Sequence, residues 1–392
     1  MTDTITETPT SRWNLQIWLL ALGMFAIGTD LFIVSGLLPA LGHDLGLSTA
    51  AAGQSVTAFA ITYAVLAPVL ASTTATIERR RLLIAVLAVF VLGNLLSALA
   101  TSYALLLISR VVAGTGAALF AATASAVAAR LAPEHRRGHA LAVVYGGMTA
   151  AIALGVPLGN LIGTLSSWRA AFGFVAALAL LAGLGLRLAL PAVAGSPGLG
   201  IVERLRVATI ARAPSALACT ALWVIGTFVV YTYLGSILDQ VTGAPDSARS
   251  WLLLLFGLGS CLGVFTGGRL ADRVNPTLGL AASIAALVLV LVGLTWALDS
   301  LVGAAIGLTV WGAVHWISFP LIQHRLLGIG GERGDTLLAV NNSAVYLGQT
   351  SAAVLGGGLA AVAGLALAPL VGAGFQILAL GALLLGRLPS PA

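Results

Sequence analysis

The chain contains very little charge and no lysine at all. Only 8% of its 392 residues are charged, 59% are hydrophobic, and all 19 basic residues are arginine. A water-soluble domain of this length could not cover its surface with so few charges, so the composition indicates an integral membrane protein. Because arginine keeps its proton in proteins, any proton that crosses this molecule has to be carried by Asp, Glu or His, with tyrosine a less suitable carrier.

Several kinds of site are also missing. The two cysteines, Cys219 and Cys261, lie in apolar segments, where they are typical of small buried hydrophobic residues rather than of a disulfide or a metal pair. The five histidines do not cluster at metal-ligand spacings, and there is no phosphate-binding loop. No soluble basic domain is present that would bind nucleic acid. The sequence therefore predicts no metal, no cofactor and no nucleic-acid partner, and an ion gradient rather than ATP as the energy source.

Twelve apolar segments are long enough to cross a lipid bilayer as helices, since a spanning helix needs about 20 apolar residues. We expect them at residues 15–39, 49–76, 82–100, 103–128, 139–163, 170–190, 214–238, 249–272, 277–297, 301–325, 336–362 and 366–386. A polar stretch divides them into two sets of six. The predicted organisation is an N-terminal tail, a first half, a linker and a second half, at residues 1–13, 14–191, 192–213 and 214–392.

The arginines in the loops favour one orientation. With the N-terminus in the cytoplasm, the outer loops carry only Arg169 and Arg249. The inner loops then carry Arg79, Arg80, Arg81, Arg130, Arg136, Arg137, Arg204, Arg206, Arg212, Arg269, Arg273, Arg325 and Arg333. Cytoplasmic loops of membrane proteins carry the excess of basic residues, so both termini and the linker are predicted to be cytoplasmic.

Small residues recur at every fourth position in four of the apolar segments. These stripes are Gly147, Ala151, Gly155, Gly159 and Gly163; Gly259, Gly263, Gly267 and Ala271; Ala344, Gly348, Ala352, Gly356, Ala360 and Gly364; and the weaker Ala60, Ala64 and Pro68. Spacing of four places each set on one helix face, where two backbones can approach closely in lipid. The stripes fall in segments two, five, eight and eleven, which indicates a repeated three-helix unit.

Two charged residues lie deep inside apolar segments. Asp30 is the only such acid and Arg110 the only such base. At 1.5 Å per residue, Asp30 lies about 13 Å and Arg110 about 10 Å from the outer end of its helix, so the depths match. An ionised carboxylate at this depth costs a few kcal/mol, and a buried arginine without an acid partner is also costly. We predict one coupled site with Asp30 as the proton carrier; the alternative is a purely structural, permanently paired carboxylate.

Apart from tyrosines, His315 is the only deeply placed titratable residue of the second half, and Trp311 shares its helix face. These two residues either belong to an ordinary helix core or line a wet cavity that contacts an aromatic substrate. Further uncharged polar residues either bond neighbouring helices or contact the cavity: Gln54, Tyr63, Asn341, Asn342 and Gln349.

The loop after the eighth segment runs Gly268-Arg269-Leu270-Ala271-Asp272-Arg273. An acid between two arginines at a helix end can form a charge clamp between neighbouring helices, and its position predicts a latch on the cytoplasmic mouth. The equivalent loop of the first half lacks the glycine. It keeps one acid, Glu78, and arginines that include Arg79 and Arg80.

These motifs resemble the major facilitator superfamily, and within it the twelve-helix drug:proton antiporter branch. The loop Gly268–Arg273 matches the family signature G-x-L-A-D-R, and Arg110 with Gly114 and Gly116 is similar to the fourth-helix motif R-x-x-x-G-x-G. The segment Gly155–Asn160, which contains Pro157, resembles the fifth-helix motif of exporters, with Asn160 in place of its final glycine. Residues 30–39 are similar to the first-helix motif that opens with Asp and ends in Pro. Trp168-Arg169 with Phe172 resembles an outer loop of sugar and chloramphenicol efflux relatives.

The resemblance implies an all-α membrane fold of two pseudo-symmetric six-helix bundles around a central cavity lined by helices one, four, seven and ten. It also implies a role for Arg110 in proton coupling. The small-residue stripes would then be sliding seams between the bundles. The packing hinge would comprise Gly155, Pro157, Gly159, Gly163, Gly259, Gly263 and Gly267.

The function predicted on these grounds is a proton-coupled exporter of small, partly apolar organic molecules, such as drugs, by alternating access. We expect it to act as a monomer in the lipid bilayer of a bacterial plasma membrane, with protons and a small molecule as its partners. Efflux of sugars or metabolites is the alternative. An enzyme would need a nucleophile–base or metal constellation, and a receptor would need larger loops; neither feature is visible.

Overall fold

The computed structural model describes residues 11–195 and 200–386, and these ranges contain helices and no strand. The helices of the first half are α1 (Ser11–Leu45), α2 (Thr49–Thr73), α3 (Arg79–Ala98), α4 (Tyr103–Leu131), α5 (Arg137–Ala150), α6 (Val156–Leu165) and α7 (Trp168–Ala189). After α8 (Ile201–Arg206) come α9 (Ala213–Tyr231), α10 (Leu234–Gln240), α11 (Asp246–Arg273), α12 (Pro276–Ala297), α13 (Leu301–Gly330), α14 (Gly334–Val362) and α15 (Ala368–Leu385). The tail predicted at residues 1–13 lies largely outside the described residues.

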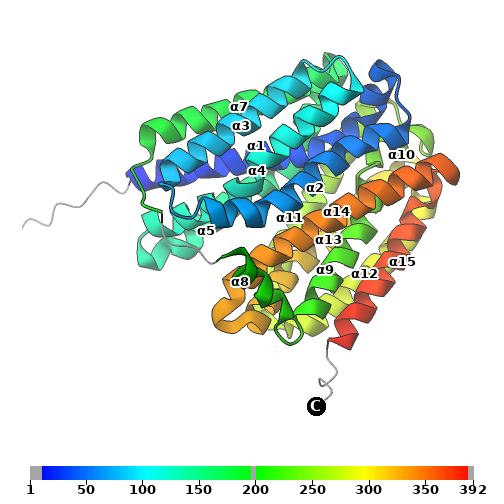
Figure 1. Cartoon of the computed structure of the whole chain (residues 1–392). Helices are drawn as coiled ribbons and strands as arrows, with labels where there is room; N and C mark the ends of the chain where they lie inside the picture. The colour runs from blue at the N-terminus through cyan, green and yellow to red at the C-terminus, as the bar shows by residue number, and fades with distance from the viewer. Residues whose placement is uncertain (1–10, 196–199, 387–392) are drawn as a thin grey trace, which may run out of the picture.

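The helices group into twelve passes. In the described ranges, 11 segments are apolar and long enough to cross a membrane, and one of these, Leu301–Val362, contains both α13 and α14. The fifth pass consists of α5 and α6, and the seventh consists of α9 and α10. Figure 1 shows two helical bundles, one built from α1–α7 and the other from α9–α15. The predicted all-α membrane fold of two six-helix bundles is thus confirmed.

Serine residues begin four of the helices at one end of the molecule. Ser48, Ser102, Ser167 and Ser300 precede α2, α4, α7 and α13, and each side chain accepts a hydrogen bond from a backbone N–H in the first helical turn. Such a cap satisfies one of the donors that a helix N-terminus leaves free. We call this end the opposite end, because it lies opposite the arginine-rich end of the molecule. It contains the loops at 46–48, 99–102, 166–167, 241–245 and 298–300. The arginine-rich end contains the segments at 74–78, 132–136, 190–195, 207–212, 274–275 and 331–333.

The fifth pass is interrupted at its centre. Between α5 and α6, residues Ala151–Gly155 form a single π-helical turn, and Pro157 occupies the second position of α6. Proline has no backbone N–H and disturbs the preceding turn of an α-helix, so the wider turn accommodates it. The exporter-like segment therefore has a local irregularity in a pass that also carries one of the small-residue stripes.

The glycine stripes of the fifth and eighth passes pack within their own bundles rather than between the bundles. A side chain at Gly147, Gly155, Gly159 or Gly163 would meet residues of α1. One at Gly259, Gly263 or Gly267 would meet the backbone of α13, with 2.5 Å to the carbonyl oxygen of Ile317 in the last case. The prediction of close helix approach is correct, but these two stripes do not form the predicted sliding seam between the bundles. Spacing of four identifies a close-packed face and does not identify the neighbouring helix.

Other glycines lie between the bundles near the opposite end. A side chain at Gly53 of α2 would meet Tyr233, which follows α9, and one at Gly235 of α10 would lie 2.5 Å from the carbonyl oxygen of Ser35 in α1. Tyr233 is itself held in place because its hydroxyl donates to the carbonyl oxygen of Ala353 at 2.6 Å. The two bundles therefore meet closely at the opposite end, through the side chain of Tyr233 at Gly53 and through backbone at Gly235.

Ion pairs tie helix ends together inside each bundle at the opposite end. In the first bundle, Arg169 of α7 pairs with Asp44 of α1 at 2.7 Å and donates to the carbonyl oxygen of Ala100. In the second bundle, Arg249 of α11 pairs with Asp239 of α10 at 2.6 Å. The two outer-loop arginines of the sequence analysis thus connect helices within a bundle, and neither links one bundle to the other.

Candidate functional site

Asp30 and Arg110 form a direct ion pair in the core of the first bundle. Nη1 of Arg110 on α4 donates to Oδ1 of Asp30 on α1 at 2.7 Å, and the two side chains are 1% and 0% exposed. The matched depths of the two residues in the sequence predicted this contact, and the structure confirms that it is direct. Removing either partner would leave an uncompensated charge in an apolar bundle, which is strongly destabilising.

Aromatic rings and glycines close the surroundings of the pair. The guanidinium of Arg110 lies 4.7 Å from the ring centre of Phe59 on α2 and 5.4 Å from that of Phe172 on α7. A side chain at Gly114 would lie 2.8 Å from a backbone atom of Phe59, and one at Gly116 would lie 2.5 Å from the backbone of α3. The spacing R-x-x-x-G-x-G therefore lets α4 approach α2 and α3 closely enough to seal the arginine.

The pair is not fully satisfied by protein groups. Oδ2 of Asp30 and Nε of Arg110 are buried and have no hydrogen-bond partner among the described residues. Asp30 does not line the central cavity described below, but the next two residues along α1, Leu31 and Phe32, do. A carboxylate with a free oxygen beside a cavity wall is able to accept a proton, and protonation would remove the charge that Arg110 is paired with.

A central cavity of about 180 Å³ lies between the two bundles. For comparison, a buried cavity of about 150 Å³ is large enough to bind benzene. Its lining residues are Met24, Leu31, Phe32, Tyr63, Ala121, Tyr145, Met148, Thr149, Trp223, Val224, Phe228, Val264, His315, Trp316, Phe319, Asn342, Val345, Tyr346 and Gln349. The walls are thus mainly aromatic and aliphatic, with a few uncharged polar groups, as is usual for small-molecule sites.

The cavity wall differs in part from the sequence prediction. Tyr63, His315, Asn342 and Gln349 line the cavity, whereas Trp311, Gln54 and Asn341 do not. Trp311 is 0% exposed and packs against Phe256 with 4.9 Å between ring centres, inside the second bundle. Gln54 lies near the opposite end, where its amide donates to the carbonyl oxygen of Ala50, and Asn341 is 1% exposed.

The helices that contribute to the cavity also differ from the expectation. The resemblance implied helices one, four, seven and ten, but α5 and α14 contribute more side chains than α4, which contributes Ala121 alone. The sequence analysis missed the aromatic residues Trp223, Phe228 and Trp316. A usable signal was present for all three, because they lie on the seventh and tenth apolar segments, which the resemblance assigned to the cavity.

A hydrogen-bonded chain holds His315 in the cavity wall. Nδ1 of His315 lies 2.9 Å from Oγ1 of Thr227 on α9, and Nε2 of Gln376 on α15 donates to the same hydroxyl oxygen at 3.3 Å and to the carbonyl oxygen of Trp223 at 3.0 Å. The imidazole also stacks on the ring of Trp223, with 4.2 Å between ring centres and 10° between planes. Three helices of the second bundle thus fix the orientation of one cavity residue.

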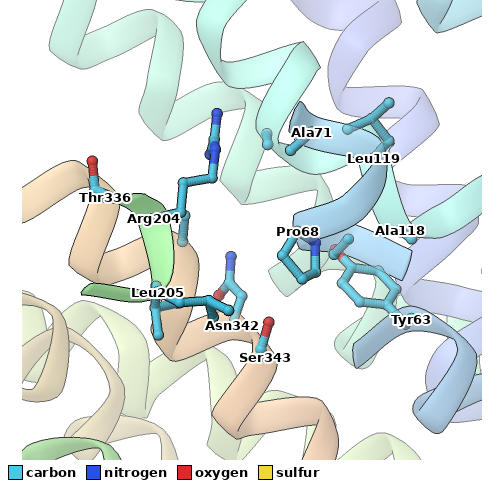
Figure 2. Close-up of a pocket in the computed structure, with 14 residues that line it drawn as sticks. Tyr63, Pro68, Ala71, Ala118, Leu119, Arg204, Leu205, Thr336, Asn342 and Ser343 are labelled. Carbon is cyan, nitrogen blue, oxygen red and sulfur yellow. The ribbon is translucent and has the colours of Figure 1, made fainter. Parts of the chain in front are cut away.

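A smaller cavity of about 90 Å³ continues from the central one toward the arginine-rich end, and the two share Tyr63 and Asn342. Figure 2 shows Tyr63 and Pro68 of α2 facing Asn342 and Ser343 of α14, with Leu205 of α8 at the edge of this space. At the boundary between the two cavities, Tyr63 stacks on Tyr346 of the other bundle with 3.6 Å between ring centres. The smaller cavity therefore lies between the central cavity and the arginine-rich end, with the stacked tyrosines at the boundary.

The predicted charge clamp is not formed in this conformation. Arg269, Asp272 and Arg273 at the end of α11 are exposed, and none of them has an ion pair within the described ranges. A side chain at Gly268 would meet nothing within 4 Å. In the first half, Glu78 pairs with Arg81, while Arg79 and Arg80 donate to the carbonyl oxygens of Ala75 and Arg187. These contacts stay within the first bundle.

Known proteins resemble the whole chain. The family model described as Major Facilitator Superfamily matches residues 20–335. The inner membrane transport protein YdhP of Escherichia coli (strain K12) is 33% identical over 336 residues, 86% of this chain and 86% of that protein. A chloramphenicol resistance protein of Streptomyces lividans is 37% identical over 263 residues, 66% of this chain and 67% of that protein. The crystal structure of a D-xylose-proton symporter matches with a TM-score of 0.78 at 18% identity, covering 97% of this chain and 98% of that one, a likeness of fold alone.

Proposed function

This chain belongs to the Major Facilitator Superfamily, a family of transporters and not of enzymes, and from that premise we propose that it is a proton-coupled exporter of small, partly apolar organic molecules. It is a multi-pass membrane protein with bacterial relatives. In this proposal it acts as a monomer in a bacterial inner membrane. The arginine-rich end and both termini face the cytoplasm, because basic residues are concentrated in cytoplasmic loops.

The buried pair of Asp30 and Arg110 beside the cavity wall is the observation that carries the proposal. A proton that reaches Asp30 neutralises the carboxylate and leaves Arg110 without its counter-charge in an apolar core. The packing that was stable with the pair intact then becomes unfavourable relative to another arrangement of the helices, so protonation shifts the conformational equilibrium. Loss of the proton restores the pair and the original packing.

The described conformation would be the loading state of such an exporter. In it, the smaller cavity extends from the central one toward the arginine-rich end, and contacts such as that of Gly53 with Tyr233 bring the bundles together at the opposite end. In the alternate state those contacts separate and the cytoplasmic mouth closes. The clamp residues Arg269, Asp272 and Arg273 would then pair across the mouth, with Glu78, Arg79 and Arg80 at the equivalent place in the first bundle.

A drug-like cargo fits the cavity better than a sugar does. Sugar sites need a dense set of hydrogen-bonding groups, whereas most of this wall is aromatic or aliphatic. The relative from Streptomyces lividans, described as a chloramphenicol resistance protein, supports the same direction. Sugar or metabolite efflux remains the alternative within the same fold.

The test is to replace Asp30 with Asn, purify the protein and reconstitute it in vesicles. We expect chloramphenicol added to vesicles of the unmodified protein to drive proton movement, and Asp30→Asn to abolish it. Asp44→Asn, an equal change at the opposite end, is the matched control and should retain coupling. Undiminished proton movement in Asp30→Asn would refute the assignment of this residue as the proton carrier.

A further inference from the structure

The central cavity offers no charged side chain to a bound molecule. Among its lining residues in the described chain there is no Asp, Glu or Arg. The nearest buried charges, Asp30 and Arg110, face each other at 2.7 Å inside the first bundle and neutralise one another. A charged solute entering the cavity would give up part of its hydration and find no counter-charge, which costs free energy, whereas an uncharged solute avoids this cost.

The hydrogen-bonded chain behind His315 determines which hydrogen that residue presents. The amide nitrogen of Gln376 can only donate, so Oγ1 of Thr227 accepts from it at 3.3 Å. The hydroxyl hydrogen of Thr227 is then free to point at Nδ1 of His315, 2.9 Å away. The carbonyl oxygen of Trp223, one helical turn before Thr227, already accepts a hydrogen bond from Gln376. With Nδ1 accepting, the neutral imidazole carries its hydrogen on Nε2, and His315 is a hydrogen-bond donor.

Two further polar atoms of the wall lack protein partners. The indole nitrogen of Trp223 is a donor and Oε1 of Gln349 is an acceptor, and neither is hydrogen-bonded within the described residues. Both side chains are 3% exposed, and both line the cavity. An unpaired buried donor or acceptor is costly, so these atoms gain free energy when a ligand satisfies them.

Aromatic rings from both bundles surround these polar atoms. Phe32 of the first bundle lies 6.1 Å from Phe228 and 6.4 Å from Trp316 of the second, measured between ring centres. Aromatic pairs at such distances favour offset or edge-to-face contacts, which a further aromatic ring can join. The cavity thus combines a ring-binding wall with polar groups that include the donors of His315 and Trp223 and the acceptor of Gln349.

We propose that the cavity selects uncharged aromatic molecules that bear carbonyl, hydroxyl or nitro groups. His315 and Trp223 donate to the oxygens of the ligand, Gln349 accepts from its N–H or O–H, and Thr227 and Gln376 are positioning residues that hold His315 as a donor. This inference rests on the proposed function only in taking the central cavity as the site of the cargo. It says nothing about how transport is driven, so the two can fail separately.

The test measures binding to the purified full-length protein in detergent, through quenching of tryptophan fluorescence. The probes are three compounds with one nitrophenyl core: uncharged chloramphenicol, its anionic succinate ester, and the cationic amine left when the dichloroacetyl group is removed, in mildly acidic buffer. We expect chloramphenicol to bind at least about tenfold more tightly than either charged compound, a difference of about 1.4 kcal/mol. Equal or tighter binding of a charged compound, or no binding of chloramphenicol, would overturn the proposal.

Variants assign the effect to particular side chains. His315→Phe should weaken chloramphenicol binding about tenfold, whereas His315→Gln, which keeps a donor N–H, should restore most of it; no difference between the two would contradict the role of the Nε2 hydrogen. Thr227→Val should weaken binding, though less than His315→Phe does. Thr227→Ser keeps the hydroxyl and should leave binding unchanged. Gln349→Glu introduces one negative charge and should reverse the preference toward the cationic amine. That gain of binding does not depend on a loss, so a merely misfolded variant cannot imitate it.

The binding assay separates this inference from the proposed function. If chloramphenicol binds selectively but drives no proton movement in vesicles, the cavity chemistry stands and proton coupling fails. If substrate-driven proton movement is found but the cationic amine is preferred, the proposed function stands and the selectivity inferred here is wrong.

Discussion

Each bundle buries a polar centre near the cavity, and the two centres differ in charge and in access to it. The first bundle holds Asp30 and Arg110 as a charged pair behind the cavity wall. The second bundle holds His315, Thr227 and Gln376 as an uncharged chain, with His315 in the wall itself. The separation suggests a division of tasks: the charged pair responds to protons, while the uncharged chain contacts the cargo.

A charged pair has to be buried away from the cavity, whereas a group that binds the cargo has to line the cavity. A charge-neutral pair in an apolar bundle is stable only while both partners remain, so its disruption by a proton has a large effect on packing. An uncharged donor costs little to keep beside a cavity and can be satisfied by changing ligands. A single centre could not easily serve both purposes.

The largest expected effect is on the stability of the first bundle. Arg110→Gln leaves the carboxylate of Asp30 unpaired and should cost about 3–5 kcal/mol. The double variant with Asp30→Asn and Arg110→Gln removes both charges and should recover most of that loss. Thermal unfolding of the purified single and double variants measures this coupling. If the stability lost in the double variant equals the sum of the losses in the two single variants, the pairing is not the source of the effect. His315→Phe, in the uncharged centre, should cost much less than Arg110→Gln.

The next largest effect is expected from glycines that let neighbouring helices pack closely inside each bundle. Gly147 and Gly267 lie against backbones of their own bundles, whereas a side chain at the adjacent Gly146 or Gly268 would meet nothing within 4 Å. Valine at Gly147 or Gly267 overpacks a closed contact and should destabilise the protein by about 1–3 kcal/mol. Valine at Gly146 or Gly268 is the matched control for helix propensity. If the two members of a pair behave alike in unfolding experiments, the close approach is not what stabilises these bundles.

A third variant acts between the bundles and should change conformation rather than stability. A side chain at Gly357 would lie 2.9 Å from the hydroxyl of Tyr233 and 3.2 Å from the amide nitrogen of Gln54 in the other bundle, whereas one at Gly358 meets nothing within 4 Å. Gly357→Val should therefore separate the bundles at the opposite end, and Gly358→Val should not.

The readout for this third variant is thiol labelling at Ser35, which is 3% exposed and lies against Gly235 in another contact between the bundles at the same end. In a background without Cys219 and Cys261, a cysteine placed at Ser35 should label severalfold faster in Gly357→Val than in Gly358→Val. Unchanged labelling would mean that the glycine contacts do not hold this end closed.

The sequence predicted the charged centre better than the uncharged one, for a physical reason. Charges are so costly in lipid that an acid and a base at matched depths have few other partners, and Asp30 with Arg110 followed from that alone. Uncharged and aromatic residues are compatible with core, lipid or cavity. Trp311 and His315 share a helix face, yet Trp311 packs inside the second bundle while Trp316, the residue after His315, lines the cavity.

The positions of the helices could be predicted from the sequence. Which helices pack against each other could not. Apolar length locates the passes, because it depends only on local sequence. Which helix lies against the stripe at Gly155, Gly159 and Gly163 depends on how the passes are arranged in space. The same limit applied to the cavity, where α5 and α14 contribute more of the wall than α4.

The smallest effect is expected at the ion pairs of the opposite end, where the two bundles again differ. Arg169 holds Asp44 and also donates to the carbonyl oxygen of Ala100, whereas Arg249 pairs only with the carboxylates of Asp239 and Asp246. Partly exposed pairs contribute about 1 kcal/mol or less. Arg249→Gln should therefore have a barely measurable effect on thermal unfolding and Arg169→Gln a slightly larger one; the reverse order would show that the backbone contact at Ala100 adds nothing.

Accumulation of chloramphenicol by inside-out vesicles containing Asp30→Asn tests the division of tasks most directly. With a proton gradient imposed, the unmodified protein should concentrate the compound. Asp30→Asn should still bind it and let it equilibrate, yet never concentrate it, because the polar residues of the second bundle that line the cavity are intact and the proton carrier is gone. Gradient-driven accumulation by Asp30→Asn, or loss of binding together with coupling, would contradict the assignment of the two tasks to two separate centres.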